Sequence, residues 1–403
     1  MDRQLELLRG LIGRWRTMLP FGCERIAVTL LASICFTIIF STAVVQTLVV
    51  ILTVVVVACH VRGNAKPFQR TPLDLPYAVF VAGRIMSIAF SRYPAESIAA
   101  LHREYFFYIV FFLVTQTVRH KKVAVSRTMV HVLVAAGVLA GFIGTAKVLL
   151  FNDMRASSTT AGPYTLGAYL CPVLALAILF VLRNKRGIAA AWRWMAPAAI
   201  ILGIIFTYDR LHWAGMVVML SLVGVFSRRR RLFYMVASGF LIVLLFPSLR
   251  FRLDQTIDIK EFMAGRDVLW RGALQLAGDH PLVGFGPRTF SHIFPLFDQM
   301  PIKGVGSWHN DYLQVYLDSG LMGLLPLLWI LAVTMYTGWR VLRLEGLKPD
   351  IRHLLQAFLM FLGVTFVLGG ILDTLVGIAF RIVLGLFALL AGSIDELKEA
   401  SER

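Results

Sequence analysis

The sequence has little charge and little cysteine for its length. Of its 403 residues, 16% are charged and 58% are hydrophobic, and only four are cysteine. A water-soluble chain of this length needs a more highly charged surface to stay dispersed, so the composition excludes an ordinary soluble enzyme. None of the four cysteines lies between residues 249 and 310, the long polar stretch, so we expect no structural disulfide.

Acidic residues are also few, and they are never spaced as a metal pair. The chain has 23 Asp and Glu residues, and no two of them stand two positions apart. This absence argues against a divalent-metal site of the kind that neutralises sugar diphosphates. We therefore expect no metal and no other cofactor.

Long apolar runs dominate what is present. They recur from residue 25 to residue 391 and reach membrane-spanning length. The pattern predicts an all-α polytopic membrane protein with about twelve transmembrane helices. The predicted spans are 25–41, 43–61, 74–90, 103–118, 128–151, 164–182, 194–207, 211–226, 232–248, 311–336, 352–371 and 375–391. Only Tyr208-Asp209-Arg210 separates the seventh span from the eighth, so this pair predicts a helical hairpin with its turn at one membrane face.

The distribution of basic residues orients the spans. With a cytoplasmic N-terminus, the inner loops carry nineteen Lys and Arg residues and the short outer loops carry four. Cytoplasmic loops are the ones enriched in Lys and Arg, so the bias predicts that both termini are cytoplasmic. The net charge of +17 then comes mostly from basic residues in the predicted cytoplasmic loops, and a nucleic-acid partner is not expected. Residues 1–24 contain no evident cleavable signal, and the first span is expected to be an anchor.

The predicted organisation follows from these spans. Residues 1–24 form a cytoplasmic segment, 25–248 hold spans one to nine, 311–391 hold spans ten to twelve, and 392–403 form a cytoplasmic tail. Residues 249–310 form one long periplasmic loop, and loops of such length are usually functional. Within it, the apolar spacing predicts a helix from Arg266 to Ala277.

Two arginines and a histidine are predicted to reach one depth at the outer face from three separate segments. Arg210 lies in the hairpin turn, Arg266 at the start of the loop helix, and His309 directly before span ten. The planar fork of arginine suits a diphosphate, and free N–H groups at a helix start favour an anion. A histidine before a helix is biased toward the neutral form that a general base requires.

Structural roles remain open for each of the three. An arginine at a membrane interface often contacts lipid phosphate, Arg266 could form a salt bridge within the loop, and a histidine beside a tryptophan at a membrane boundary is common. A second set of ionisable residues could line a cationic substrate pocket that admits a lipid diphosphate. This set is Arg84, Lys147, Arg155, Arg288, Asp373 and Arg381. The alternative is an interhelical ion pair of Asp373 with Arg84 or Arg381.

Three motifs include these residues. They are His-Asn-Asp-Tyr-Leu at 309–313 followed by Gly320, GRDVLW at 265–270 with DHPLVGFG at 279–286, and TYDRLHW at 207–213. The first fits the pattern H-[NSQ]-x-x-L-x-x-x-x-x-x-G. Together they resemble the O-antigen ligase and polymerase-like family of membrane glycosyltransferases, which includes protein O-oligosaccharyltransferases. The resemblance covers residues 155–340, whereas the first four spans match only in hydropathy.

The resemblance implies a fold, a reaction and site roles. The fold would be GT-C-like and embedded in the bacterial inner membrane, with transfer of a glycan from undecaprenyl diphosphate at the periplasmic face. By position, Arg210 and Arg266 would hold the diphosphate and His309 would activate the acceptor hydroxyl. One departure is Asp209, where a small residue is expected, because an adjacent carboxylate could pin Arg210 or weaken its phosphate binding.

Within that family the sequence favours an O-antigen ligase: an inverting, metal-independent glycosyltransferase with lipid A-core as acceptor. The loop is of modest size and no large domain follows the last span. O-antigen polymerase and protein O-oligosaccharyltransferase remain open. A transporter or flippase for a lipid-linked glycan is the alternative of another class, although no matching pair of Gly/Pro-broken segments is found in the two halves.

Overall fold

The computed structural model describes residues 23–61, 68–183, 189–227, 241, 244–254, 263, 265–300, 305–371, 374–375 and 377–394. Every regular element in these residues is a helix, which agrees with the predicted all-α fold. The elements are α2 (Cys23–Thr37), α3 (Thr42–Val61), α4 (Asp74–Ala89), α5 (Pro94–Arg103), η1 (Tyr105–Tyr108), α6 (Ile109–Thr117), α7 (Lys122–Phe151), α8 (Pro163–Arg183), α9 (Ala189–Ile205), α10 (Arg210–Ser227), α12 (Pro247–Asp254), α14 (Arg266–Leu276), α15 (Phe290–Ile293), η2 (Phe297–Gln299), α16 (Asp311–Leu342), α17 (Pro349–Leu368) and α18 (Ile378–Gly392).

The helices agree with a polytopic membrane protein. Four of them, α3, α7, α16 and α17, are long and apolar enough to cross a membrane. Helix α5 and the following η1–α6 segment, bent by 42°, could together form a fifth span, and α8, α9, α10 and α18 contain shorter apolar helices. The predicted ninth span, 232–248, falls mostly outside the described residues. The count of twelve spans therefore stays a prediction.

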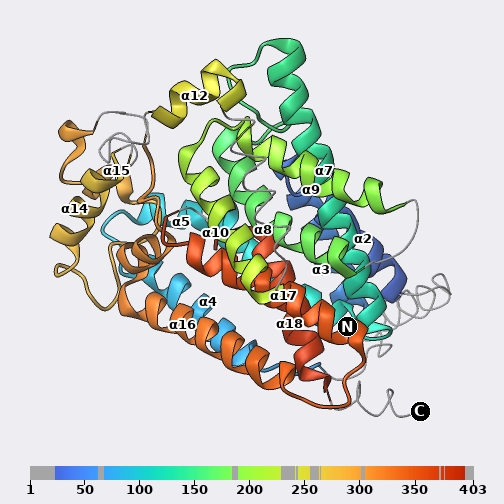
Figure 1. The fold of residues 1–403 in the computed structure, drawn as a ribbon. Coiled ribbons are helices and arrows are strands. Elements are labelled where there is room, and N and C mark those ends of the chain that lie inside the picture. Colours follow the sequence, from blue (N-terminus) through green and yellow to red (C-terminus); the bar gives the residue numbers. More distant parts are fainter. Residues whose placement is uncertain are drawn as a thin grey trace, which may run out of the picture.

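Helices pack closely at positions where glycine, which has no side chain, lies in the contact. Helix α4 runs beside α16, and α7 beside α9 (Figure 1). A Cβ atom at Gly83 of α4 would lie 2.2 Å from the Met322 carbonyl oxygen of α16. At Gly141 of α7 it would lie 2.5 Å from the Ala199 carbonyl oxygen of α9. Small residues at such crossings allow backbones to approach, which stabilises helix pairs through packing inside a membrane.

Helix ends that the charge bias predicts on the same side of the membrane lie together in the structure. Helix ends assigned to the cytoplasmic side contact one another. Four pairs join them: Glu24 with Arg119, His60 with Arg119, Lys122 with Ser393, and Arg127 with Asp350. The starts of α8, α10 and α16 gather elsewhere, at the end that carries α14 and α15 (Figure 1). The side of the membrane that each end faces stays a prediction.

The long loop docks into a break in α16. Gly320 has φ 57° and ψ −154°, which interrupts the helix. Loop residues replace the lost helical hydrogen bonds: Leu321 N–H donates to the Pro281 carbonyl at 2.8 Å, and Phe285 N–H donates to the Leu317 carbonyl at 2.7 Å. A Cβ at Gly320 would lie 2.3 Å from the Leu282 carbonyl carbon, so glycine is required there. The break explains why the loop motif 279–286 accompanies the helix motif.

Candidate active site

The turn that carries His309 has an unusual backbone. His309 has φ +48°, a left-handed conformation that is uncommon outside glycine. The next residue, Asn310, caps α16, because its side-chain oxygen accepts from the N–H groups of Tyr312 (3.0 Å) and Leu313 (3.1 Å). Its amide nitrogen donates to the Gly370 carbonyl at 2.8 Å. The second residue of the family motif therefore has a structural role, as a helix N-cap, and left-handed residues such as His309 concentrate at functional sites.

The His309 ring is half-buried between a hydroxyl and an aromatic ring. Its Nδ1 lies 3.3 Å from the Ser307 Oγ. Its ring centroid lies 5.2 Å from that of Tyr164, near the start of α8. A hydrogen-bond partner at one ring nitrogen biases the tautomer and the orientation of the imidazole.

The hairpin between α9 and α10 places a carboxylate, not only an arginine, beside this turn. Asp209 caps α10 through a 3.0 Å hydrogen bond from the Leu211 N–H to Oδ1. The Arg155 Nη2 lies 3.6 Å from Asp209 Oδ2, and the His212 Nδ1 lies 3.4 Å from Oδ1. The carboxylate that departs from the family pattern is thus engaged by Arg155 and His212.

The groups around Asp209 shift the pKa of its carboxyl. Burial raises its pKa, but the contact with His212 and the positive charges of Arg266 and Arg155 outweigh burial, so that the pKa lies below its ordinary value. A carboxylate so placed stays ionised at neutral pH. The influence of Arg266 shows that the loop helix α14 and the hairpin share one electrostatic environment.

Arg266 is buried, and one of its hydrogen-bond donors has no partner among the described residues. It is the first residue of α14 and follows Gly265, which has φ +83°. The residue is 7% exposed, and its buried Nε has no hydrogen-bond partner among the described residues. A buried guanidinium at a helix start, where backbone N–H groups also point outward, is a suitable place for an anion.

The structure brings the segments that carry the three predicted residues to one region. Arg210 is the first residue of α10, Arg266 is the first residue of α14, and His309 stands two residues before α16. The Tyr164 ring links two of these segments, because it lies 5.1 Å from the His212 ring and 5.2 Å from the His309 ring. Three helix starts therefore converge where developing negative charge would be stabilised.

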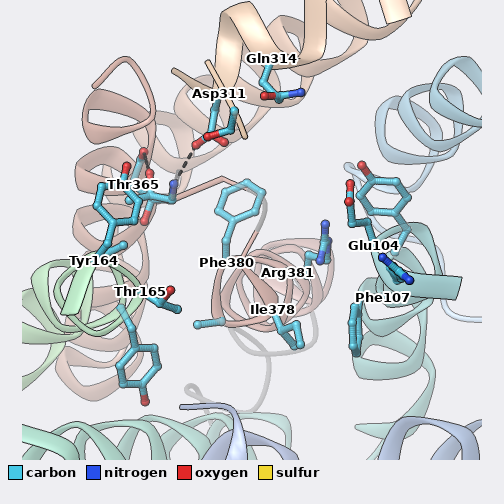
Figure 2. Close-up of a pocket in the computed structure, with 18 of the residues that line it drawn as sticks. Glu104, Phe107, Tyr164, Thr165, Asp311, Gln314, Thr365, Ile378, Phe380 and Arg381 are labelled. Carbon is cyan, nitrogen blue, oxygen red and sulfur yellow. Dashed lines mark hydrogen bonds between the residues drawn. The ribbon is translucent and has the colours of Figure 1, made fainter. Parts of the chain in front are cut away.

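A cavity of about 680 Å³ lies beside the His309 turn, although Arg210, Arg266 and His309 are not themselves in its lining. Tyr164 and Ser307, which both contact His309, are in its lining, and so are Asp311 and Gln314 of α16. Figure 2 shows α16 on one side of this space, with Arg381 and Phe380 of α18 between Thr365 and Phe107. The lining combines charged and polar side chains with apolar ones, which suits an amphipathic ligand.

The predicted pocket residues divide into two groups. Arg84, Arg288 and Arg381 line the cavity. Lys147 and Arg155 do not; the first donates to the Ser158 carbonyl (2.7 Å) and the second to the Thr207 carbonyl (2.6 Å). Asp373 lies outside the described residues.

Arg84 forms an ion pair that the sequence did not suggest, and the suggested pair with Asp373 stays a prediction because Asp373 lies outside the described residues. The Arg84 Nη2 lies 2.9 Å from Asp318 Oδ2, and both side chains are buried, so Asp318 of α16 is its acidic partner among the described residues. Arg288 is also paired, with Glu104 at 2.7 Å. Arg381 lies over the Tyr108 ring at 4.5 Å. Arg84 and Arg288 are thus largely neutralised by the protein itself.

Sequence reasoning missed Tyr164, Gln314 and Asp318. Asp318 stands within a predicted span, so the rule that drew attention to Arg84 as an intramembrane charge would also have found it. No pattern singles out Tyr164 or Gln314, since their contacts join segments far apart in the sequence. Within the described residues, no group of three His, Cys, Asp or Glu could hold a metal ion. Metal independence stays a prediction.

Residues 195–328 match the family model described as O-antigen ligase. Over this segment, about a third of the chain, the protein is similar to that family. The segment includes the hairpin arginine, the loop helix and the His309 turn, so the resemblance seen in the motifs is confirmed. No curated protein matches the chain.

Proposed function

We propose that this protein is an O-antigen ligase: an inverting glycosyltransferase that moves a glycan from undecaprenyl diphosphate to lipid A-core. The observation that carries the proposal is the convergence of a left-handed histidine turn with the helix starts of Arg210 and Arg266, beside an amphipathic cavity. The family match supports glycan transfer of the ligase or polymerase type.

In the proposed reaction His309 is the general base. It takes the proton of an acceptor hydroxyl, whose oxygen then attacks the anomeric carbon on the face opposite the diphosphate. The bond between that carbon and the diphosphate oxygen breaks, and its electron pair leaves with undecaprenyl diphosphate. Arg210 and Arg266 stabilise the charge that develops on the leaving group, which replaces the usual role of a metal.

The acceptor decides between members of the family. An O-antigen polymerase would use a second lipid-linked glycan, and a protein O-oligosaccharyltransferase would use a peptide hydroxyl. The His309 turn serves all three equally, because each acceptor offers a hydroxyl. A lipid-linked glycan transporter would use the cavity but would not need the histidine as a base.

One reconstitution tests these options. Purified protein in detergent is mixed with undecaprenyl-diphosphate glycan and, separately, with lipid A-core, a second donor molecule or a serine-containing peptide. We expect product with lipid A-core, in the absence of any sealed membrane. His353→Ala is the matched control, because His353 is exposed and lies at the opposite end of the bundle. Product only in sealed vesicles would contradict an enzyme.

His309→Ala separates the base from the binding site. The variant should lose transfer, whereas the His353→Ala control should keep it. Donor binding should persist in His309→Ala, since the arginines are intact. A rate near that of the wild type in His309→Ala would contradict the proposed chemistry.

A further inference from the structure

Gln314 contacts the peptide group that joins Ser307 to Trp308, the second peptide group before His309. This residue lies one turn into α16 and lines the cavity. Its Oε1 accepts a hydrogen bond from the Trp308 N–H at 3.2 Å. Its Nε2 donates to Asp318 Oδ1 at 2.8 Å. One side chain thus joins the backbone of the histidine turn to a buried carboxylate.

That carboxylate is fixed from a second helix. Arg84 of α4 donates to Asp318 Oδ2 at 2.9 Å, to the Ser319 Oγ at 2.9 Å and to the Tyr108 hydroxyl at 3.3 Å. The Asp318 and Arg84 side chains are only 4% and 2% exposed. The acceptor for Gln314 is therefore held from outside α16 and has little freedom to move.

The chemistry of the two partners selects an amide at position 314. A backbone N–H can only donate, and an ionised carboxylate can only accept. An amide meets both demands in a single orientation, with its oxygen toward Trp308 and its nitrogen toward Asp318. A methionine of similar length meets neither demand, and an ionised glutamate meets only the first.

The turn needs to be held on both sides. A non-glycine residue in the left-handed region persists where the surrounding structure holds it there. Asn310 fixes the side that follows His309 through its bonds to the helix start and to Gly370. Gln314 fixes the side that precedes it, through Trp308.

We propose that Gln314 is a positioning residue for His309, and that the Asp318–Arg84 pair anchors it. This inference rests on the proposed role of His309 as the base. Gln314 holds the Ser307–Trp308 peptide, and with it the backbone that enters the His309 turn, so that the imidazole is aimed at the acceptor hydroxyl. It does not take up a proton or touch the reacting atoms.

Gln314→Met is the first test, read as separate kcat and KM values for transfer. We expect kcat to fall by about 10²-fold, the cost of misplacing a catalytic group by about 1 Å, while both KM values stay near wild type. In the background of His309→Ala, the same substitution should cause no further loss, because Gln314 acts only through His309. A further loss there, a change confined to KM, or an unchanged kcat would overturn the proposal.

Gln314→Glu gives a readout that a merely structural contact would not produce. When protonated, the new carboxyl accepts from Trp308 and donates to Asp318 as the amide does. When ionised, it has no donor and repels Asp318. The ratio of its kcat to the wild-type kcat should therefore be near one at about pH 5.5 and fall by at least tenfold, roughly, as the pH rises through the range where such paired carboxyls titrate.

The wild-type ratio removes the effect of other titrating groups. His309 itself, Asp311 of α16, Glu104 beside η1, and Arg84 with Tyr108 face this region in wild type and variant alike. The Gln314→Met ratio should not depend on pH. A kcat ratio for Gln314→Glu that does not change with pH would overturn the proposal. This variant alone is sufficient to test the proposal if Gln314→Met fails to fold.

Tyr316→Phe is the matched control on the same helix. It removes a 2.6 Å hydrogen bond from α16 to the Ala277 carbonyl of the loop but leaves the His309 turn intact. Its kcat should stay near wild type. Activity in His309→Ala would overturn the proposed function, whereas a dead His309→Ala with a fully active Gln314→Met would overturn only the positioning role.

Discussion

Removing Arg84 should destabilise the protein without removing a substrate contact. Arg84 makes three hydrogen bonds with Asp318, Ser319 and Tyr108, and it is 2% exposed. Taking away one partner of a buried ion pair typically costs about 3–5 kcal/mol, because the other charge is left without compensation. We therefore expect Arg84→Met to lower the free energy of unfolding by about that amount.

The paired substitution makes the reasoning testable. Replacement of a whole buried pair by apolar residues is often neutral, so Arg84→Met with Asp318→Leu should recover more than half of the lost stability. Transfer should not recover, because Gln314 loses its anchor at Asp318. The donor KM of folded Arg84→Met should stay near wild type, since Arg84 is already neutralised by Asp318.

The assay is unfolding of the purified protein in mixed detergent and SDS micelles, with transfer kinetics measured on the same samples. Tyr316→Phe serves as the control for the loss of a single hydrogen bond, worth about 1 kcal/mol. The reasoning is refuted if the double variant is as unstable as Arg84→Met. It is also refuted if Arg84→Met keeps full stability but raises the donor KM, as a substrate-binding arginine would.

Four other outcomes are expected. Transfer should survive EDTA without added Mg²⁺ or Mn²⁺, and restoration of a lost rate by either ion would contradict this. Arg266→Lys keeps the charge but loses the paired fork, so kcat should fall by up to about 10²-fold in steady-state kinetics; an unchanged rate would exclude Arg266 from the diphosphate site. Gly286→Ala should lower the unfolding temperature, because the added Cβ would lie 2.2 Å from the Ser91 Oγ at a backbone φ of +95°. For Asp209→Asn, the stability difference from wild type should be present at neutral pH and shrink in acidic buffer. A carboxylate with a lowered folded pKa stabilises the protein above its ordinary pKa and loses that effect as the pH falls. A difference that grows in acid would contradict this.

The helices could be predicted well from the sequence because hydropathy is a local property. The predicted hairpin at 208–210 and the loop helix at 266–277 both lie where the structure has them. The contacts among described helix ends agree with the grouping that the charge bias predicts, whereas the side of the membrane that each group faces stays a prediction.

The parts that could not be predicted depend on distant contacts. Arg84 and Asp318 stand 234 positions apart, so only the packing of α4 against α16 shows them to be partners. The break at Gly320 was visible as a motif glycine, but its purpose depends on the docked loop 281–286. The role of Gln314 follows from the strained backbone at His309, which no sequence pattern reveals.

The central claim is that His309 is the base for transfer to the acceptor hydroxyl. The most direct measurement uses His309→Gly, because glycine accepts the φ of +48° without strain and leaves space for an added imidazole. The account predicts a loss of roughly 10²–10⁴-fold in transfer rate, with partial recovery in millimolar imidazole and unchanged donor binding. A His309→Gly enzyme that transfers glycan at near the wild-type rate, with no response to imidazole, would contradict it.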